Sequence, residues 1–243
     1  MPYAILRMEK HKGGSSTALE RHHEREKETY ASNPDIDVKR TIDNYHIKQP
    51  KGKYYYEIQR RIEAARCRIR KDSVKMVDTI IAVTPEFVHE LPAEEQRALF
   101  QHAYDFMAEK VGEKNIFSAV IHMDEATPHM HLCFVPLTKD NRLSAKDILG
   151  NKAAMRKWQD EFHTHMSARW PMLERGEPAR ETGREHMDTE EFKMSQFKEL
   201  EETKRRLRKL QRMWESVPYP IMKKIYDQEQ AKQRDARQKN FER

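Results

Sequence analysis

Three histidines that lie within ten residues constrain this chain more than any other stretch of it. His122 closes one apolar run, and His129 and His131 open the next. Because side chains alternate between the two faces of a strand, His129 and His131 project from the same face. Pro128 cannot continue a ladder of hydrogen bonds, so residues 126–128 are expected to end a hairpin connection that returns the chain past His122. The pattern therefore predicts that three imidazoles converge.

Three imidazoles around an open position are typical of a catalytic metal site. Two carboxylates, Asp124 and Glu125, lie in the same stretch and add to that interpretation. The alternative is a polar hairpin whose histidines are satisfied within the core. The stretch alone leaves both open.

The predicted elements indicate an α+β fold. Strands are expected at 3–8, 41–47, 74–83, 116–123 and 129–138, with helices at 17 to about 32, 54–70, 93–110 and 148–170. This order favours a sandwich in which a central, mainly antiparallel sheet is flanked by helices. Thr17 and Glu20 form a capping box for the first helix, which would place His22, Arg25 and Glu26 on one face. A solvent-facing polar stripe is the other interpretation of that face.

The composition suggests a compact domain with a basic appendage. The chain has 243 residues and a net charge of +6, of which residues 189–243 contribute 15 Lys/Arg against 10 Asp/Glu. We expect a catalytic domain over 1–188 and a helical extension over 189–243, with a modest heptad seam at Leu200, Leu207, Leu210 and Trp214. This seam could pair with a second copy or stay solvated.

The cellular location expected is the bacterial cytoplasm. Cys67 and Cys133 lie in unrelated contexts and imply no disulfide framework. The first residues show neither a basic leader nor a long apolar run, so we expect no secretion signal and no membrane segment.

Several motifs together resemble a known family. His129-Met130-His131 is the His-hydrophobe-His element that names the HUH endonucleases, and residues 122–131 resemble the third motif of the MobV (Mob/Pre) plasmid relaxases. Residues 22–25 resemble that family's first motif, and residues 33–37 with 44–45 resemble its second. Residues 70–72 also match. The resemblance spans about residues 1–190 and implies an HUH relaxase fold; relaxases of this kind usually carry further C-terminal coiled coil, so the chain is expected to be either a truncated or a compact member.

The resemblance implies a chemistry. Relaxases break one DNA strand at an origin of transfer by transesterification and leave the 5′ phosphate bound to the protein. The resemblance implies that His122, His129 and His131 hold a divalent ion, which polarises the scissile phosphate. We expect manganese, because an all-imidazole site is softer than magnesium prefers; magnesium remains an alternative, and zinc or nickel is expected to bind too.

The resemblance also implies that His22 is the nucleophile. Glu125 is expected to hold the tautomer of His22, and Arg25 is expected to hold a phosphate oxygen. Tyr30 and Tyr45 are the alternative nucleophiles.

The partner expected is plasmid DNA at the origin of transfer, single-stranded around the nick. Side chains expected to contact it are Arg7, Lys10, Lys12, Asn44, Arg70 and Lys71. A homodimer through the C-terminal helix is a further expectation. The rival functions are a rolling-circle replication initiator of the same superfamily, a metal-stabilised DNA-binding protein without cleavage activity and, with less support, a zinc hydrolase.

Overall fold

The computed structural model describes most of the chain. The structure describes residues 2–12, 16–27, 33, 35–176, 189–218, 220–224, 226, 228 and 232. For residues 189–197 it describes the backbone only. The chain divides into two compact units, Met1–Arg184 and Glu185–Arg243, which are treated separately below.

The first unit alternates strands with helices. Its elements are β1 (Ala4–His11), α1 (Ser16–His23), the 3-10 helix η1 (Val38–Asp43), β2 (Tyr45–Lys48), α2 (Tyr54–Ala65), β3 (Met76–Val83), α3 (Pro85–Glu90), α4 (Ala93–Val111), the 3-10 helix η2 (Glu113–Asn115), β4 (Ile116–His122), β5 (His129–Phe134), α5 (Ala145–Leu149) and α6 (Lys152–Arg169).

The strands form one antiparallel sheet in the order β1-β3-β5-β4-β2. β3 and β5 lie inside the sheet and are almost wholly buried. The mixed fold with a mainly antiparallel sheet, expected from the sequence, is therefore confirmed. The hairpin between β4 and β5 pairs His122 with His129, which fixes the register of the histidine stretch.

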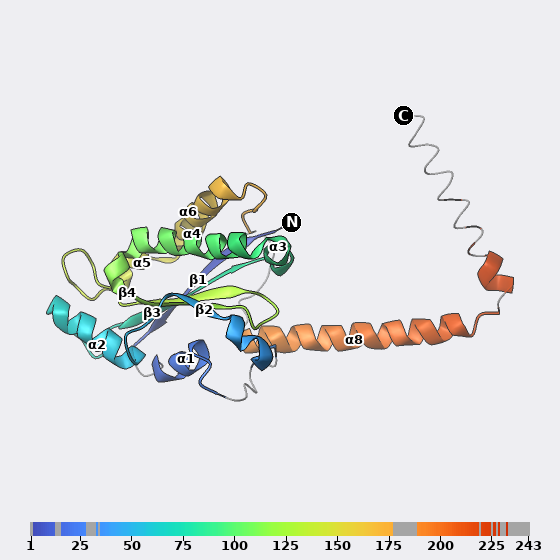
Figure 1. Cartoon of the computed structure of the whole chain (residues 1–243), viewed down its shortest axis with the longest axis horizontal. Helices are drawn as coiled ribbons and strands as arrows, with labels where there is room; N and C mark the ends of the chain where they lie inside the picture. Colours follow the sequence, from blue (N-terminus) through green and yellow to red (C-terminus); the bar gives the residue numbers. More distant parts are fainter. Residues whose placement is uncertain are drawn as a thin grey trace. The chain divides into compact units, whose positions relative to one another are not determined.

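The sheet separates two layers of helices (Figure 1). On one face, α4 and α6 cover the main core, in which Ile81, Met130 and Phe100 are fully buried. On the other face, α2 covers a smaller apolar cluster around Tyr54, Phe117 and Cys133. The histidines point to this second face, because His122, His129 and His131 alternate with Ile121, Met130 and Leu132 of the main core.

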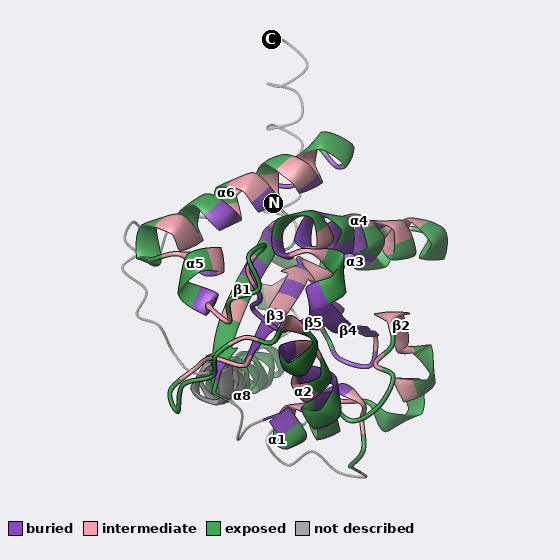
Figure 2. Cartoon of the chain, turned by 90° about the vertical axis from the view of Figure 1, so that its left-hand side faces the viewer, coloured by how far each residue is buried: buried purple, intermediate pink, exposed green. Residues whose placement is uncertain are grey.

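Part of that second face is solvent-exposed. Burial is deepest in β3, β5 and β4, whereas β1 alternates between buried and exposed residues (Figure 2). Arg7 is exposed, and it pairs with Ile80, which pairs on its other side with His131. Since paired residues share a face, the exposed Arg7 lies on the same side of the sheet as the histidines.

Two helices end earlier than the sequence patterns predicted. α1 stops at His23 rather than near residue 32, and α2 stops at Ala65 rather than at Arg70. In each case an arginine just beyond the helix adopts a left-handed backbone, with φ of 51° at Arg25 and 49° at Arg66. A left-handed residue cannot continue a right-handed helix, so each of these arginines is part of the helix end.

The second unit contains α8 (Thr189–Glu215). Its predicted seam residues are open to solvent, with Leu200, Leu207, Leu210 and Trp214 50–61% exposed. No helix in the described part of the chain combines the length and apolar character needed to cross a membrane.

Candidate active site

Three imidazoles lie together at one end of the β4–β5 hairpin. The ring centroids of His122 and His129 are 5.1 Å apart, those of His122 and His131 are 5.1 Å apart, and those of His129 and His131 are 5.0 Å apart. All three side chains are buried. The period of two along β5 and the hairpin register together produce this convergence.

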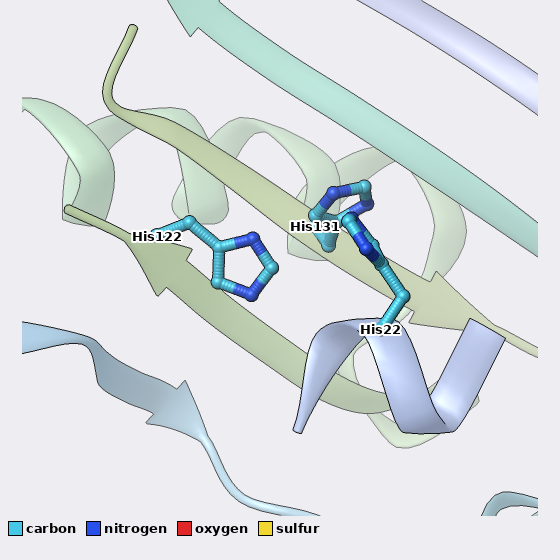
Figure 3. A group of neighbouring side chains, drawn as sticks. All are labelled: His22, His122 and His131. Carbon is cyan, nitrogen blue, oxygen red and sulfur yellow. The ribbon is translucent and has the colours of Figure 1, made fainter. Parts of the chain in front are cut away.

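His22 joins the cluster from the last turn of α1. Its ring centroid lies 5.6 Å from that of His122 and 5.3 Å from that of His131. Figure 3 shows these three rings pointing toward one another from a helix and two neighbouring strands. Ring nitrogens of His22, His122 and His131 all lie within 4.8 Å of one another, close enough to meet one ion or one substrate atom.

Each histidine of the hairpin has one nitrogen engaged by an oxygen acceptor. His122 Nε2 lies 2.9 Å from the His23 carbonyl, His129 Nδ1 lies 2.8 Å from the Thr127 carbonyl, and His131 Nδ1 lies 3.2 Å from Asp78 Oδ2. An imidazole that donates a proton at one nitrogen keeps a lone pair at the other. The buried Nδ1 of His122 has no hydrogen-bond partner in the described structure. Two groups that contain His122 have ligand atoms within 4.8 Å of one another, one formed with His22 and His131 and one formed with Glu125 and His129.

The histidines are held in their neutral forms. Burial is the main cause that lowers the pKa of His22 to about 3, and the neighbouring His131 is the second cause. The same two causes lower the pKa of His129 to about 4. Burial also lowers the pKa of both His122 and His131. Neutral imidazole is the form that ligates a metal or attacks an electrophile.

Arg25 joins α1 to the β4–β5 connection. It donates from Nε and Nη2 to the two oxygens of Asp124 at 2.8 Å each, from Nη2 to Glu125 Oε1 at 2.7 Å, and from Nη1 to the His22 carbonyl at 3.0 Å. Its side chain is only 5% exposed. The guanidinium that was expected to hold a phosphate oxygen is thus committed to two carboxylates, which favours a positioning role.

Glu125 lies between Arg25 and the imidazoles. Its Oε1 accepts from Arg25, and its Oε2 accepts from Asn33 Nδ2 at 2.9 Å. Oε1 also lies 3.9 Å from His129 Nε2 and 4.0 Å from His122 Nδ1, the two nitrogens left with free lone pairs. The expected role of Glu125 in setting the tautomer of His22 stays a prediction.

A second polar network was missed in the sequence. Asp78 Oδ2 lies 3.5 Å from His23 Nε2 as well as close to His131, and His23 Nδ1 lies 3.3 Å from the Tyr54 hydroxyl. Burial alone would raise the pKa of Asp78, but His23 and His131 lower it well below its ordinary value. The available signal was an aspartate within the apolar run of β3, since an unpaired carboxylate is rarely buried.

Tyr45 does not face the cluster, and Asn44 is engaged within the protein. Tyr45 pairs with Ile121, which belongs to the main core, and Arg97 of α4 lies 4.3 Å from its ring. Tyr45 is therefore on the opposite face of the sheet from His22, and this geometry contradicts the interpretation as an alternative nucleophile. Asn44 Oδ1 accepts from the Met123 amide at 2.7 Å, so the side chain expected to contact DNA braces the hairpin connection instead. Tyr30, the other alternative, lies outside the described residues.

The predicted basic residues gather at the far end of the sheet. Lys10, Lys12, Arg70 and Lys71 are exposed, and the Lys75 amide donates to the His11 carbonyl, which ties the segment after α2 to the end of β1. β3 runs from Met76, at that end, to Ile80 beside His131, about 13 Å along the strand. Lys10 pairs with Val77 of the main core and therefore lies on the opposite face of the sheet from His131.

A family model described as plasmid recombination enzyme (Mob_Pre) matches residues 1–194. A plasmid recombination enzyme type 3 from Staphylococcus aureus is 36% identical over 198 residues, which is 79% of this chain and 48% of that protein. A plasmid recombination enzyme from Bacillus thuringiensis is 34% identical over 201 residues, covering 82% of this chain and 44% of that protein. The chain spans about half the length of these curated relatives.

Solved structures of a MobM relaxase domain (MOBV; Mob_Pre) are also similar. A manganese-bound crystal structure at pH 6.8, bound to plasmid pMV158 oriT DNA, has a TM-score of 0.73 and 32% sequence identity, over 79% of this chain and 98% of that chain. The same domain bound to a 26-nucleotide oriT DNA has a TM-score of 0.63 and 28% identity, over 78% of this chain and 99% of that chain.

Proposed function

The chain belongs to the Mob_Pre family of plasmid recombination enzymes, and from that premise we propose that it is a plasmid mobilisation relaxase. It nicks one DNA strand at an origin of transfer and stays attached to the 5′ phosphate. Residues 1–188 form the catalytic domain and residues 189–243 a helical extension. The substrate is plasmid DNA in the bacterial cytoplasm, single-stranded around the nick.

One observation supports this proposal above the others. A neutral imidazole, His22, reaches from α1 to His122 and His131, and each of the three hairpin imidazoles keeps one nitrogen lone pair available. Three ligands beside a nucleophile are what a metal-assisted transesterification requires. A zinc hydrolase would leave His22 and Arg25 without a role.

His122, His129 and His131 would hold a divalent ion, which when bound polarises the scissile phosphate and neutralises charge on its oxygens. The related relaxase structures contain manganese, and we propose manganese here. Magnesium, zinc and nickel are the competitors to be compared. Glu125 Oε1, near the free nitrogens of His122 and His129, is positioned to add an oxygen ligand.

His22 attacks the phosphorus with an unprotonated ring nitrogen. An N–P bond forms, the bond from phosphorus to the 3′ oxygen breaks, and the departing oxygen becomes a 3′ hydroxyl after it gains a proton. The ring becomes more positive as its lone pair enters the new bond. Glu125 opposes that charge, since its carboxylate acts to raise the pKa of His22 against the larger lowering by burial. Arg25 holds both groups by bonding to Glu125 and to the His22 carbonyl.

The DNA backbone follows the exposed basic surface of the sheet. Arg7 shares the face of the histidines, Lys12, Arg70 and Lys71 are exposed near the end of β1 that carries His11, and Lys10 lies at that end on the opposite face. Such contacts position the strand without reading its sequence. A second copy of the chain pairs through α8, whose seam leucines are exposed.

The covalent adduct tests the proposal. Wild-type protein incubated with manganese and supercoiled plasmid should relax the DNA and retain a protein-linked fragment, and His22→Ala should lose the adduct. Tyr45→Phe should retain it and serves as the matched control. An adduct formed by His22→Ala would exclude the histidine nucleophile. Binding without relaxation by the wild-type protein would favour a non-cleaving DNA-binding protein, and a cut mapped to a replication origin would favour a replication initiator.

A further inference from the structure

η1 is anchored to the connection that follows His122. The Asp37 amide donates to the Asp124 carbonyl at 2.8 Å, and Thr41 Oγ1 donates to Asp124 Oδ2 at 2.9 Å. Just past the helix, Asn44 Oδ1 accepts from the Met123 amide. Because Asp124 is itself held by Arg25, these bonds fix η1 relative to the histidine cluster.

The outward side of η1 combines an apolar group with a cation. Ile42 is 90% exposed, the highest fraction among the large hydrophobic side chains that the structure describes. Residues three apart are eclipsed in a 3-10 helix, so Lys39 and Ile42 share one face while Thr41 points elsewhere, to Asp124. A branched alkyl group and an ammonium group are therefore presented side by side.

The chemistry of this surface fits nucleic acid better than protein. A stable protein partner needs about 800 Å² per side, far more than one aliphatic side chain provides. Single-stranded DNA offers both features that this surface matches, an apolar base face and a phosphate next to it. Isoleucine is among the apolar side chains that proteins insert between bases to unstack them. The bonds from Thr41 to Asp124 and from the Met123 amide to Asn44 place η1 next to the connection that follows His122, one of the proposed metal ligands.

We propose that η1 is a single-strand DNA contact in which Ile42 packs against an unstacked base next to the nick while Lys39 binds a neighbouring phosphate. The inference rests on the proposed function for the identity of the site. Strand binding, however, can be measured without cleavage, so the two can fail separately.

Fluorescence anisotropy with a labelled single strand of mixed sequence and about 20 nucleotides, longer than the ~4–16 nucleotides that a single-strand-binding fold covers, tests the contact. Ile42→Ser should weaken binding about fivefold, at the lower end of a base-stacking contact, and should leave the salt dependence unchanged because no charge is lost. Lys39→Ser should reduce the slope of log affinity against log salt by about 0.7, as expected for one phosphate contact to a single strand. Ile42→Leu keeps a branched alkyl group and should bind the strand as the wild type does.

Met172→Ser is the matched control, because Met172 is also exposed, at 61%, but follows α6 on the other side of the sheet. Equal binding by Ile42→Ser and wild type would overturn the inference, as would an equal loss in Met172→Ser. If wild-type protein does not nick plasmid but Ile42→Ser still weakens strand binding, the proposed function fails and the η1 contact stands. If the wild-type protein nicks plasmid and Ile42→Ser does not weaken strand binding, the proposed function stands and the η1 contact fails.

Discussion

Asp78 Oδ2 lies 3.2 Å from Nδ1 of His131, with both side chains almost excluded from water. A carboxylate that accepts a proton from one ring nitrogen fixes the tautomer and aims the other nitrogen at a metal. The same oxygen lies 3.5 Å from His23 Nε2, directly next to His22 in the chain. Asp78 therefore orients a proposed ligand and positions the end of the helix that bears the proposed nucleophile.

Replacing this carboxylate should weaken metal binding. Asp78→Asn keeps the side-chain volume but removes the charge, and we expect manganese affinity to fall by about 10- to 100-fold. Isothermal titration of metal-free protein with manganese measures the change. Asp105→Asn, at an exposed position on α4, is the control and should bind as wild type does. Unchanged affinity in Asp78→Asn would show that Asp78 does not orient a ligand.

Removing the Arg25 guanidinium should destabilise the fold. Arg25→Ala leaves Asp124 and Glu125 buried without their cation, and breaking a buried ion pair in this way costs about 3–5 kcal/mol. Urea unfolding followed by circular dichroism gives the difference in free energy. Arg142 also bonds two carboxylates, Asp140 and Asp147, but at the surface. Arg142→Ala should therefore show no measurable change, and an equal loss in both variants would contradict the prediction.

The metal-free protein should lose stability in mild acid. The folded pKa values of His22, about 3, and His129, about 4, lie below the unfolded value, and those of His122 and His131 are lowered too. The unfolded chain thus takes up protons that the folded chain does not, so stability is complete above about pH 6.5 and falls as the pH drops toward the folded values. His22 and His129 each contribute about 1 kcal/mol between about pH 6.5 and 5.5, or roughly 2 kcal/mol together.

Urea unfolding across that pH range measures this loss. His129→Gln should reduce the pH dependence, since one of the histidines with a lowered pKa is gone. His163→Gln is the control, because His163 lies outside the cluster and bonds to the Leu173 carbonyl. A free energy of unfolding that does not change with pH in this range would contradict the lowered pKa values.

The parts of the site that sequence reasoning found are those set by local periodicity. Alternation along β5 determined the common face of His129 and His131, and the hairpin register brought in His122. The end of α1 could not be predicted from local sequence, because it depends on Arg25 bonding to Asp124, which lies 99 positions further along the chain. A capping box and a polar stripe indicate where the helix begins but hold no information on that distant pair.

Roles that depend on tertiary partners were likewise out of reach. Arg25, in the first motif, was expected to hold a phosphate oxygen, yet its donors meet carboxylates in the fold. Tyr45 belongs to the second motif, but the register of β2 against β4 turns it toward α4. Shifting that pairing by one residue would have turned it to the histidine face. Neither outcome can be derived from spacing.

A second copy of the chain should associate through the seam of α8. Leu207 is 56% exposed at the middle of the seam, and two such helices would bury it against its counterpart. Leu207→Asp puts a charge in that apolar seam and should convert a dimer to a monomer in light scattering coupled to size exclusion. Arg206→Asp changes the neighbouring residue outside the seam and should leave the mass unchanged. A wild-type protein that is monomeric at every concentration, or a Leu207→Asp variant that still dimerises, would rule out this seam as the interface.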